Sequence, residues 1–200
     1  MNTTAAAVTS KYLRLSLPPA STSLVSLWFL LLTLLTAATA SAQEASAEYQ
    51  LKAAFLFKFP LYVEWPAQTF AASDSPLVFG VMASEPMFIG LQELAEGRTV
   101  DGHMVSVQRL QPDAALTSVH VLFIGSEFGD ATPALLQQAV SRAILTVTEA
   151  STPVPADSMI NFNVSEDRVR FDIATAPARA AGLTLSSRLL QVAQTVRETR

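Results

Sequence analysis

The 200-residue chain contains no cysteine. Exported proteins often use disulfides to stabilise their folds, so this chain has to rely on its core alone. The same absence excludes a lipidated cysteine, thiolate metal sites and cysteine nucleophiles. The chain is therefore not a lipoprotein of this kind, a thiolate metalloprotein or a thiol enzyme.

Basic residues and glycine motifs are also scarce. Beyond residue 42 the only lysines are Lys52 and Lys58, and 11 basic side chains face 17 acidic ones, a net charge of −6. This balance is untypical of nucleic-acid-binding proteins and of basic helices that lie on membranes. None of the seven glycines belongs to a dinucleotide-binding GxGxxG pattern or to a phosphate-binding loop.

The N-terminus carries the one long apolar run, at residues 24–38 (LVSLWFLLLTLLTAA). It follows a segment whose only charges are Lys11 and Arg14, and Ala40-Ser41-Ala42 follows it. This order predicts a secretory signal peptide that is cleaved after Ala42. The alternative is an uncleaved membrane anchor, but a run of about 15 residues falls short of the roughly 20 that span a bilayer.

Residues 1–42 are thus predicted to be removed, and residues 43–200 to form a single domain of ordinary size. Export without a lipid anchor predicts a periplasmic protein that no longer contacts the membrane after cleavage.

Strand and helix patterns alternate along residues 43–200, which predicts an α/β layered fold with a mixed, largely parallel sheet. The predicted strands are residues 77–82, 104–110, 119–125 and 143–148, followed by a hairpin at about 159–173. The predicted helices are residues 46–59, 84–95, 112–117, 132–142 and 175–181, followed by an amphipathic C-terminal helix.

The opening helix leads into LKAAFLFKFPLYVEWP at residues 51–66. Its predicted apolar face consists of Leu51, Ala54, Phe55 and Phe59. Pro60 lacks an N–H group, so we expect the helix to stop or bend near Phe59. Lys52, Lys58 and Pro60 exclude a second membrane span.

The sequence INFNVSEDRVRFDI predicts the register in which the two strands of the hairpin pair. Pairing Val164 with Val169, Phe162 with Phe171 and Ile160 with Ile173 places every apolar residue against an apolar partner. The other face then carries Asn161, Asn163 and Asp172, which we expect to be exposed. Asp172 is expected to pair with Arg168 or Arg170. The two asparagines are candidates for binding a ligand, although an ordinary exposed face is the simpler interpretation.

The C-terminal helix is predicted to begin at Ser186, whose hydroxyl suits an N-cap. Its apolar stripe consists of Leu189, Val192 and Val196, widened by Leu190 and Ala193. This stripe would pack on the sheet.

No catalytic, cofactor-binding or metal-ligating residue can be assigned. The chain has only two histidines, His103 and His120, and their spacing does not fit a metal site. His120 is predicted to have a structural role, because it lies in a strand of the buried type. The sequence GSEFG at 125–129 has Glu127 where a nucleophile elbow needs serine. A serine–histidine–acid triad assembled by the fold stays open as a weak alternative.

Two blocks in the right order resemble the YfiR-like family of exported proteins. Residues 51–66 resemble the family's opening helix with its aromatic-x-Glu-Trp-Pro exit. Residues 144–193 resemble its second block: a Leu-Thr-Val strand, a hairpin, an Ala-rich segment, then Gly-Leu and Ser-Ser-x-Leu-Leu. VHVLFIG at 119–125 also fits, so the resemblance covers residues 49–197.

This resemblance implies a non-catalytic α/β domain in the periplasm. It implies a repressor that binds the periplasmic sensor region of an inner-membrane diguanylate cyclase and thereby lowers cyclic di-GMP and biofilm formation. It also implies an OmpA-like outer-membrane lipoprotein that sequesters the repressor, and a possible homodimer. No cofactor is implied.

The chain departs from the family pattern at several positions. Val119 stands where family members often have a cysteine, so disulfide-based redox control is absent. Asp157-Ser158 replaces a Gly-Gly turn, Ala174 replaces an asparagine, and Pro60 replaces a residue that continues the helix. These changes concern the choice of partner more than the fold.

For the partner surface we single out Tyr62, Glu64 and Trp65, because a tryptophan beside a proline at a helix exit is a common anchor. A tryptophan that merely caps the core is the alternative. A second hypothesis is a small-ligand sensor with its site at Gly125–Asp130, a loop at the carboxyl end of a strand. An exported hydrolase that uses His103 or His120 is the third.

Overall fold

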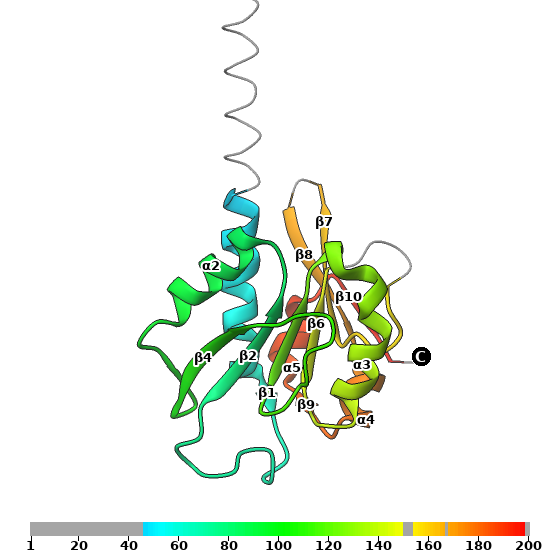
Figure 1. Ribbon diagram of the computed structural model, residues 1–200. Helices are drawn as coiled ribbons and strands as arrows, with labels where there is room; N and C mark the ends of the chain where they lie inside the picture. Colours follow the sequence, from blue (N-terminus) through cyan, green and yellow to red (C-terminus); the bar gives the residue numbers. More distant parts are fainter. Residues whose placement is uncertain (1–45, 150–153, 167, 199–200) are drawn as a thin grey trace, which may run out of the picture. The chain divides into compact units, whose positions relative to one another are not determined.

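The computed structural model describes residues 46–149, 154–166 and 168–198. The predicted signal peptide and its cleavage site lie outside the described residues. Eight strands form one sheet in the order β10-β8-β7-β6-β5-β2-β4-β3, and most neighbours are parallel (Figure 1). The predicted α/β fold with a mixed, largely parallel sheet is therefore confirmed.

The strands of this sheet are β2 (Leu77–Met82), β3 (Thr99–Val100), β4 (His103–Arg109), β5 (Val121–Ile124), β6 (Leu145–Thr148), β7 (Ile160–Ser165), β8 (Arg168–Ala174) and β10 (Thr195–Arg197). A separate two-stranded sheet pairs β1 (Val63–Glu64) with β9 (Thr184–Leu185). The helices are a first helix at residues 46–58, η1 (Phe59–Tyr62), α2 (Glu85–Ala95), η2 (Ser126–Ala131), α3 (Thr132–Val140), α4 (Thr175–Ala180) and α5 (Ser187–Val192).

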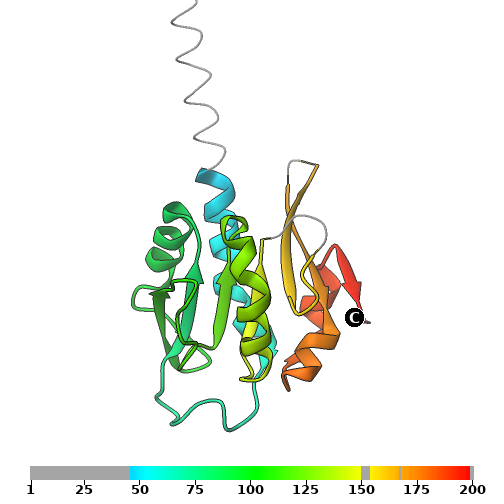
Figure 2. The same ribbon diagram turned by 45° about the vertical axis from the view of Figure 1, so that its right-hand side comes forward.

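Alternate strand residues supply two separate parts of the core. All six residues of β2 are buried. Phe79 packs in a cluster with Leu56 of the first helix and Met87 of α2, whereas Met82 packs in a second cluster with Leu136 of α3. Since side chains alternate between the two faces of a strand, the sheet is a middle layer, with α3 on one face and the first helix and α2 on the other (Figure 2).

Pro60 ends the first helix as predicted. The α-helix runs to residue 58, Pro60 lies in the short 3₁₀ turn η1, and Val63 is already extended. The predicted apolar face is only partly right, because Leu51 is 45% exposed. The buried side of the helix is instead formed by Lys52, Ala53, Leu56 and Phe59. The predicted face did not include Lys52, because a pattern of apolar residues cannot show that a lysine is buried.

The hairpin register is confirmed at every predicted pair, from Ile160↔Ile173 to Val164↔Val169. Its second face is not simply exposed. Asn161 is buried, and its Oδ1 accepts a hydrogen bond from the Thr148 hydroxyl at 2.7 Å across the β6–β7 pair. Asp172 accepts a hydrogen bond from Asn163 at 3.0 Å rather than pairing with the neighbouring arginines.

The C-terminal helix is shorter than predicted. Ser186 is the N-cap, since its hydroxyl accepts a hydrogen bond from Leu189 N at 3.3 Å. The helix α5 ends at Val192, and Val196 lies in β10, opposite Ile173 of β8. The β-branched residues Thr195 and Val196 suit a strand, and the outer edge of β8 offers them backbone partners that the helical pattern does not reveal.

Two further predictions need correction. Residues 112–117 form turns and irregular chain rather than a helix. The helix predicted at 132–142 has no separate start, because the 3₁₀ helix η2 runs directly into α3 and the Thr132 hydroxyl donates to Phe128 O at 3.1 Å. The helix then ends at Val140, two residues early.

Candidate functional site

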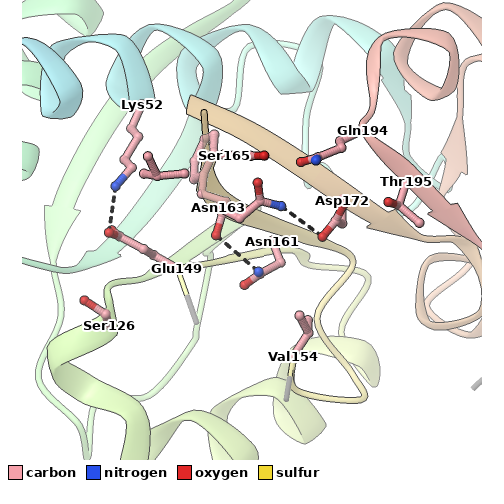
Figure 3. Close-up of a pocket in the computed structure, with 12 residues that line it drawn as sticks. Lys52, Ser126, Glu149, Val154, Asn161, Asn163, Ser165, Asp172, Gln194 and Thr195 are labelled. Atoms are coloured by element: carbon pink, nitrogen blue, oxygen red, sulfur yellow. Dashed lines mark hydrogen bonds and ion pairs between the residues drawn. The ribbon is translucent and has the colours of Figure 1, made fainter. Parts of the chain in front are cut away.

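A polar pocket of about 610 Å³ opens where β5 and β6 end, with the β7–β8 hairpin as one wall. In open α/β sheets ligands commonly bind beyond the carboxyl ends of the strands. The pocket is lined by residues from several separate segments of the chain: Lys52, Ser126, Glu149, Val154, Asn161, Phe162, Asn163, Val164, Ser165, Asp172, Gln194 and Thr195 (Figure 3).

Lys52 is the buried cation of this pocket, with a side chain only 1% exposed. Its Nζ donates to Glu149 Oε1 at 2.7 Å and also to Glu48, one helical turn earlier. Burial lowers the pKa of Lys52, but the hydrogen bonds and charges of Glu149 and Glu48 outweigh it, and the net pKa is raised above 10.5. Lys52 therefore remains an ammonium ion and ties the first helix to the end of β6.

The opposite wall consists of amides and a carboxylate from the hairpin. Asn163 Nδ2 donates to Asp172 Oδ2 at 3.0 Å, and Asn161 Nδ2 donates to Phe162 O at 3.1 Å (Figure 3). The Oδ1 atom of Asn163 is buried, and no hydrogen-bond donor reaches it within the described residues. A buried acceptor without a partner is costly, so a ligand with an N–H or O–H group would gain from meeting it.

The chemistry that this pocket offers is hydrogen bonding rather than metal binding. Among the described residues no group of three or more histidine and carboxylate side chains is placed to hold a metal ion. Neither histidine lines the pocket. Ser126 therefore has no imidazole beside it, and the arrangement suits a small polar molecule better than a nucleophilic attack.

Both histidines lie at the other end of the sheet, stacked on the two faces of Phe70. The ring centroid of Phe70 is 4.0 Å from that of His103 and 4.5 Å from that of His120. His120 Nδ1 accepts from Val78 N at 3.1 Å, and His103 Nδ1 lies 2.6 Å from Ser75 O. This stack anchors the connection between β1 and β2 and gives His120 the structural role that its position predicted.

Desolvation by burial lowers the pKa of His120, and the nearby His103 lowers it further, against a smaller opposing effect of the Thr69 backbone. Nδ1 accepts a hydrogen bond, so the ring is held as the neutral tautomer that is protonated on Nε2. His120 is thus a poor proton carrier in the folded state and a firm structural contact.

Tyr62, Glu64 and Trp65 lie together where the first helix gives way to β1. Tyr62 O accepts from Ser186 N at 2.9 Å, and Glu64 pairs with Thr184 across the β1–β9 ladder. The Trp65 ring is half-buried and meets Phe70 edge-on, at 6.2 Å between centroids. Glu64 is exposed. Their assignment to a partner surface stays a prediction.

The loop predicted as a sensor site, Gly125–Asp130, forms η2, and its Ser126 reaches the polar pocket. The predicted loop contributes Ser126 to this pocket, and the prediction did not include Lys52 or Glu149. Glu48 and Lys52 have the i, i+4 spacing of a helical ion pair, and Glu149 directly follows a fully buried strand. These two features were the signals in the sequence that could have indicated Lys52 and Glu149. The contact between Lys52 and Glu149 spans 97 residues of sequence.

Within the described part of the chain, no helix combines the length and the hydrophobicity that crossing a membrane requires. No curated protein matches the sequence. A protein-family model described as YfiR/HmsC-like matches residues 49–194, which include both end blocks and every strand of the large sheet except β10.

Proposed function

Because the chain belongs to the YfiR/HmsC-like family, we propose that it is a non-catalytic periplasmic regulator. It binds the periplasmic sensor region of an inner-membrane diguanylate cyclase and represses it, which lowers cyclic di-GMP and biofilm formation. The family match is the observation that carries this proposal. The position of the histidines, away from the polar pocket and engaged in stacking, supports a non-catalytic role.

Repression of this kind is a shift of population between two states of the cyclase. The regulator lowers activity only if it binds the inactive state more tightly than the active one. Each tenfold preference corresponds to about 1.4 kcal/mol. A surface of ordinary size, with one or two aromatic anchors, supplies this readily.

The proposal has further parts that go beyond the family match. Residues 1–42 act as a signal peptide cut after Ala42, and residues 43–200 act as one periplasmic domain. Tyr62, Glu64 and Trp65 form part of the surface that meets the cyclase. An OmpA-like lipoprotein of the outer membrane competes for the regulator, which also forms homodimers.

A second candidate function is a sensor that binds a small polar molecule and passes the signal to a membrane partner. The polar pocket with its buried Lys52–Glu149 pair and the unpaired Asn163 Oδ1 favours it. Thermal unfolding with amino acids, sugars and nucleotides should then show stabilisation, about 2.7 kcal/mol at a hundredfold excess over the dissociation constant. Asn163→Leu should remove it. No stabilisation by any compound would count against the sensor.

The repressor proposal is tested by deleting the gene in a strain that expresses the cyclase. Cyclic di-GMP, measured by mass spectrometry, should rise, and the wild-type gene should restore the low level. The Glu64→Lys/Trp65→Ala variant should restore the low cyclic di-GMP level less completely than the control variant Met104→Ala. Met104 is a 54% exposed side chain on β4. Unchanged cyclic di-GMP after deletion contradicts repression. Full restoration by the Glu64/Trp65 variant contradicts only the surface assignment.

A further inference from the structure

The outer edge of β8 is covered over only part of its length. The strand β10 pairs with Asp172, Ile173 and Ala174 and stops there. Toward the hairpin turn, from Arg168 to Arg170, no strand of the described residues pairs with this edge. An uncovered edge is a row of unpaired N–H and C=O groups and a natural template for another strand.

The backbone groups that this edge exposes can be identified. Phe171 O accepts a hydrogen bond from Gln194 N at 2.9 Å, so the Phe171 carbonyl points outward, away from β7. Backbone groups of alternate residues point to the same edge of a strand. The N–H and C=O of Val169 therefore also point outward, beyond the first residue of β10.

A groove of about 780 Å³ runs beside this edge, and the first helix forms its other wall. Both elements extend toward the same end of the domain (Figure 1). The groove is lined by Ala47, Glu48, Leu51, Phe55, Val164, Arg168, Val169 and Arg170. Leu51 is 45% exposed and Val164 is 54% exposed, so apolar surface faces solvent on both walls. A cleft between an edge strand and a helix is a known setting for strand addition by an extended peptide.

The charge of the groove indicates what kind of segment fits. Arg168 and Arg170 are exposed, while the carboxylate of Glu48 is engaged by Lys52. The groove is therefore positive, on a chain whose residues 43–200 carry a net charge of −6. Opposite charge steers association and selects among partners, so acidic side chains are favoured here.

We propose that this groove binds an extended segment of a partner protein in which apolar and acidic side chains alternate. The segment adds a strand to β8 above β10, places its apolar side chains against Leu51 and Phe55, and pairs its carboxylates with Arg168 and Arg170. This surface lies at the start of the first helix, apart from Tyr62, Glu64 and Trp65 at its exit. It does not depend on the identity of the partner as a cyclase.

The direct test uses a blocked hexapeptide, Glu-Val-Glu-Val-Glu-Val, and the same length of Lys-Val repeat as its control. In two-dimensional NMR titrations the acidic peptide should shift the amides of Val169 and Phe171 and the methyl groups of Leu51. It should also slow hydrogen exchange at the Val169 amide, because strand addition gives this group a partner. The Lys-Val peptide should bind about tenfold more weakly or worse.

Charge reversal provides the matched control. Arg168→Glu/Arg170→Glu should weaken the acidic peptide at least about tenfold and bind the Lys-Val peptide in its place. Leu51→Glu should weaken the acidic peptide, because it removes apolar contact and adds a carboxylate that repels it. Met104→Glu, at an exposed residue of β4, should leave binding of the acidic peptide unchanged. All four substitutions lie at exposed side chains, so the fold should be preserved.

Two results would overturn the proposal. One is the absence of shifts at Val169 and Leu51 at millimolar concentrations of the acidic peptide. The other is a dimer that Leu51→Glu dissociates, together with a wild-type protein that binds no peptide even when dilution makes it monomeric, which would make a second copy the occupant. Neither result bears on repression, since cyclic di-GMP is measured separately in the deletion strain.

Discussion

Lys52 is a buried charge whose desolvation cost is offset by its partners. Removing an ammonium ion from water costs several kcal/mol unless partners replace the water. Glu149 and Glu48 both do so, and the Tyr49 ring lies 5.7 Å from Nζ. Glu149 keeps 22% of its side chain exposed, so the pair lies at the boundary between core and pocket.

Glu149→Gln should therefore destabilise the protein by about 1–3 kcal/mol, because it leaves Lys52 with Glu48 alone. Chemical denaturation at pH 7 measures this. Glu93→Gln, on the exposed side of α2, is the control and should stay within about 0.5 kcal/mol. Equal losses in the two variants would mean that the buried pair contributes nothing special.

The Lys52–Glu149 pair also makes the stability of the fold depend on pH in the alkaline range. The pKa of Lys52 is raised above 10.5 in the folded state, so its contribution to stability is complete below that pH and is lost as the pH rises further. The free energy of unfolding should fall above pH 10.5 in the wild type. It should fall less in Lys52→Met, and identical slopes would contradict this account.

The lowered pKa of His120 predicts a loss of stability at low pH. Its pKa is lowered in the folded state, so the unfolded chain binds more protons and stability declines as the pH falls below 6.5. The free energy of unfolding between pH 7 and pH 5 should decline less in His120→Gln, which retains an acceptor for Val78 N–H. His103→Gln should keep most of the decline. Parallel curves for the wild type and His120→Gln would show that folding does not change the pKa of this ring.

At the scale of elements, the hairpin and the first helix differ in how well sequence predicts them. The register of β7 and β8 follows from a period of two and a short loop, both local properties. The buried face of the first helix and the strand β10 depend on Glu149 and on the edge of β8, which are distant in sequence. Local patterns therefore predicted the hairpin and missed these two features.

The register of the hairpin predicts unequal effects for two apolar residues on the same face. Phe171 is 3% exposed and packs on Phe59 at 5.1 Å between ring centroids, whereas Val164 near the turn is 54% exposed. Phe171→Ala should cost about 3–5 kcal/mol. Val164→Ala should cost less than about 1 kcal/mol. Urea denaturation distinguishes the two, and similar losses would contradict the packing described for this face.

At the scale of the whole molecule, the layers place two kinds of surface at separate ends of the first helix. The helix exit carries Tyr62, Glu64 and Trp65, and the helix start forms one wall of the basic groove. Family membership was predictable because both end blocks are continuous in sequence. The polar pocket was not, since its lining comes from segments that only the fold assembles.

The central claim is repression of a membrane diguanylate cyclase by direct binding. The most direct measurement is the rate of cyclic di-GMP synthesis by the cyclase in reconstituted membranes, as the purified protein is added to the side of the sensor region. The account predicts that the rate falls with protein concentration and saturates. It predicts that the Glu64→Lys/Trp65→Ala variant needs about tenfold more protein for the same effect. A rate that stays unchanged at saturating protein would contradict it.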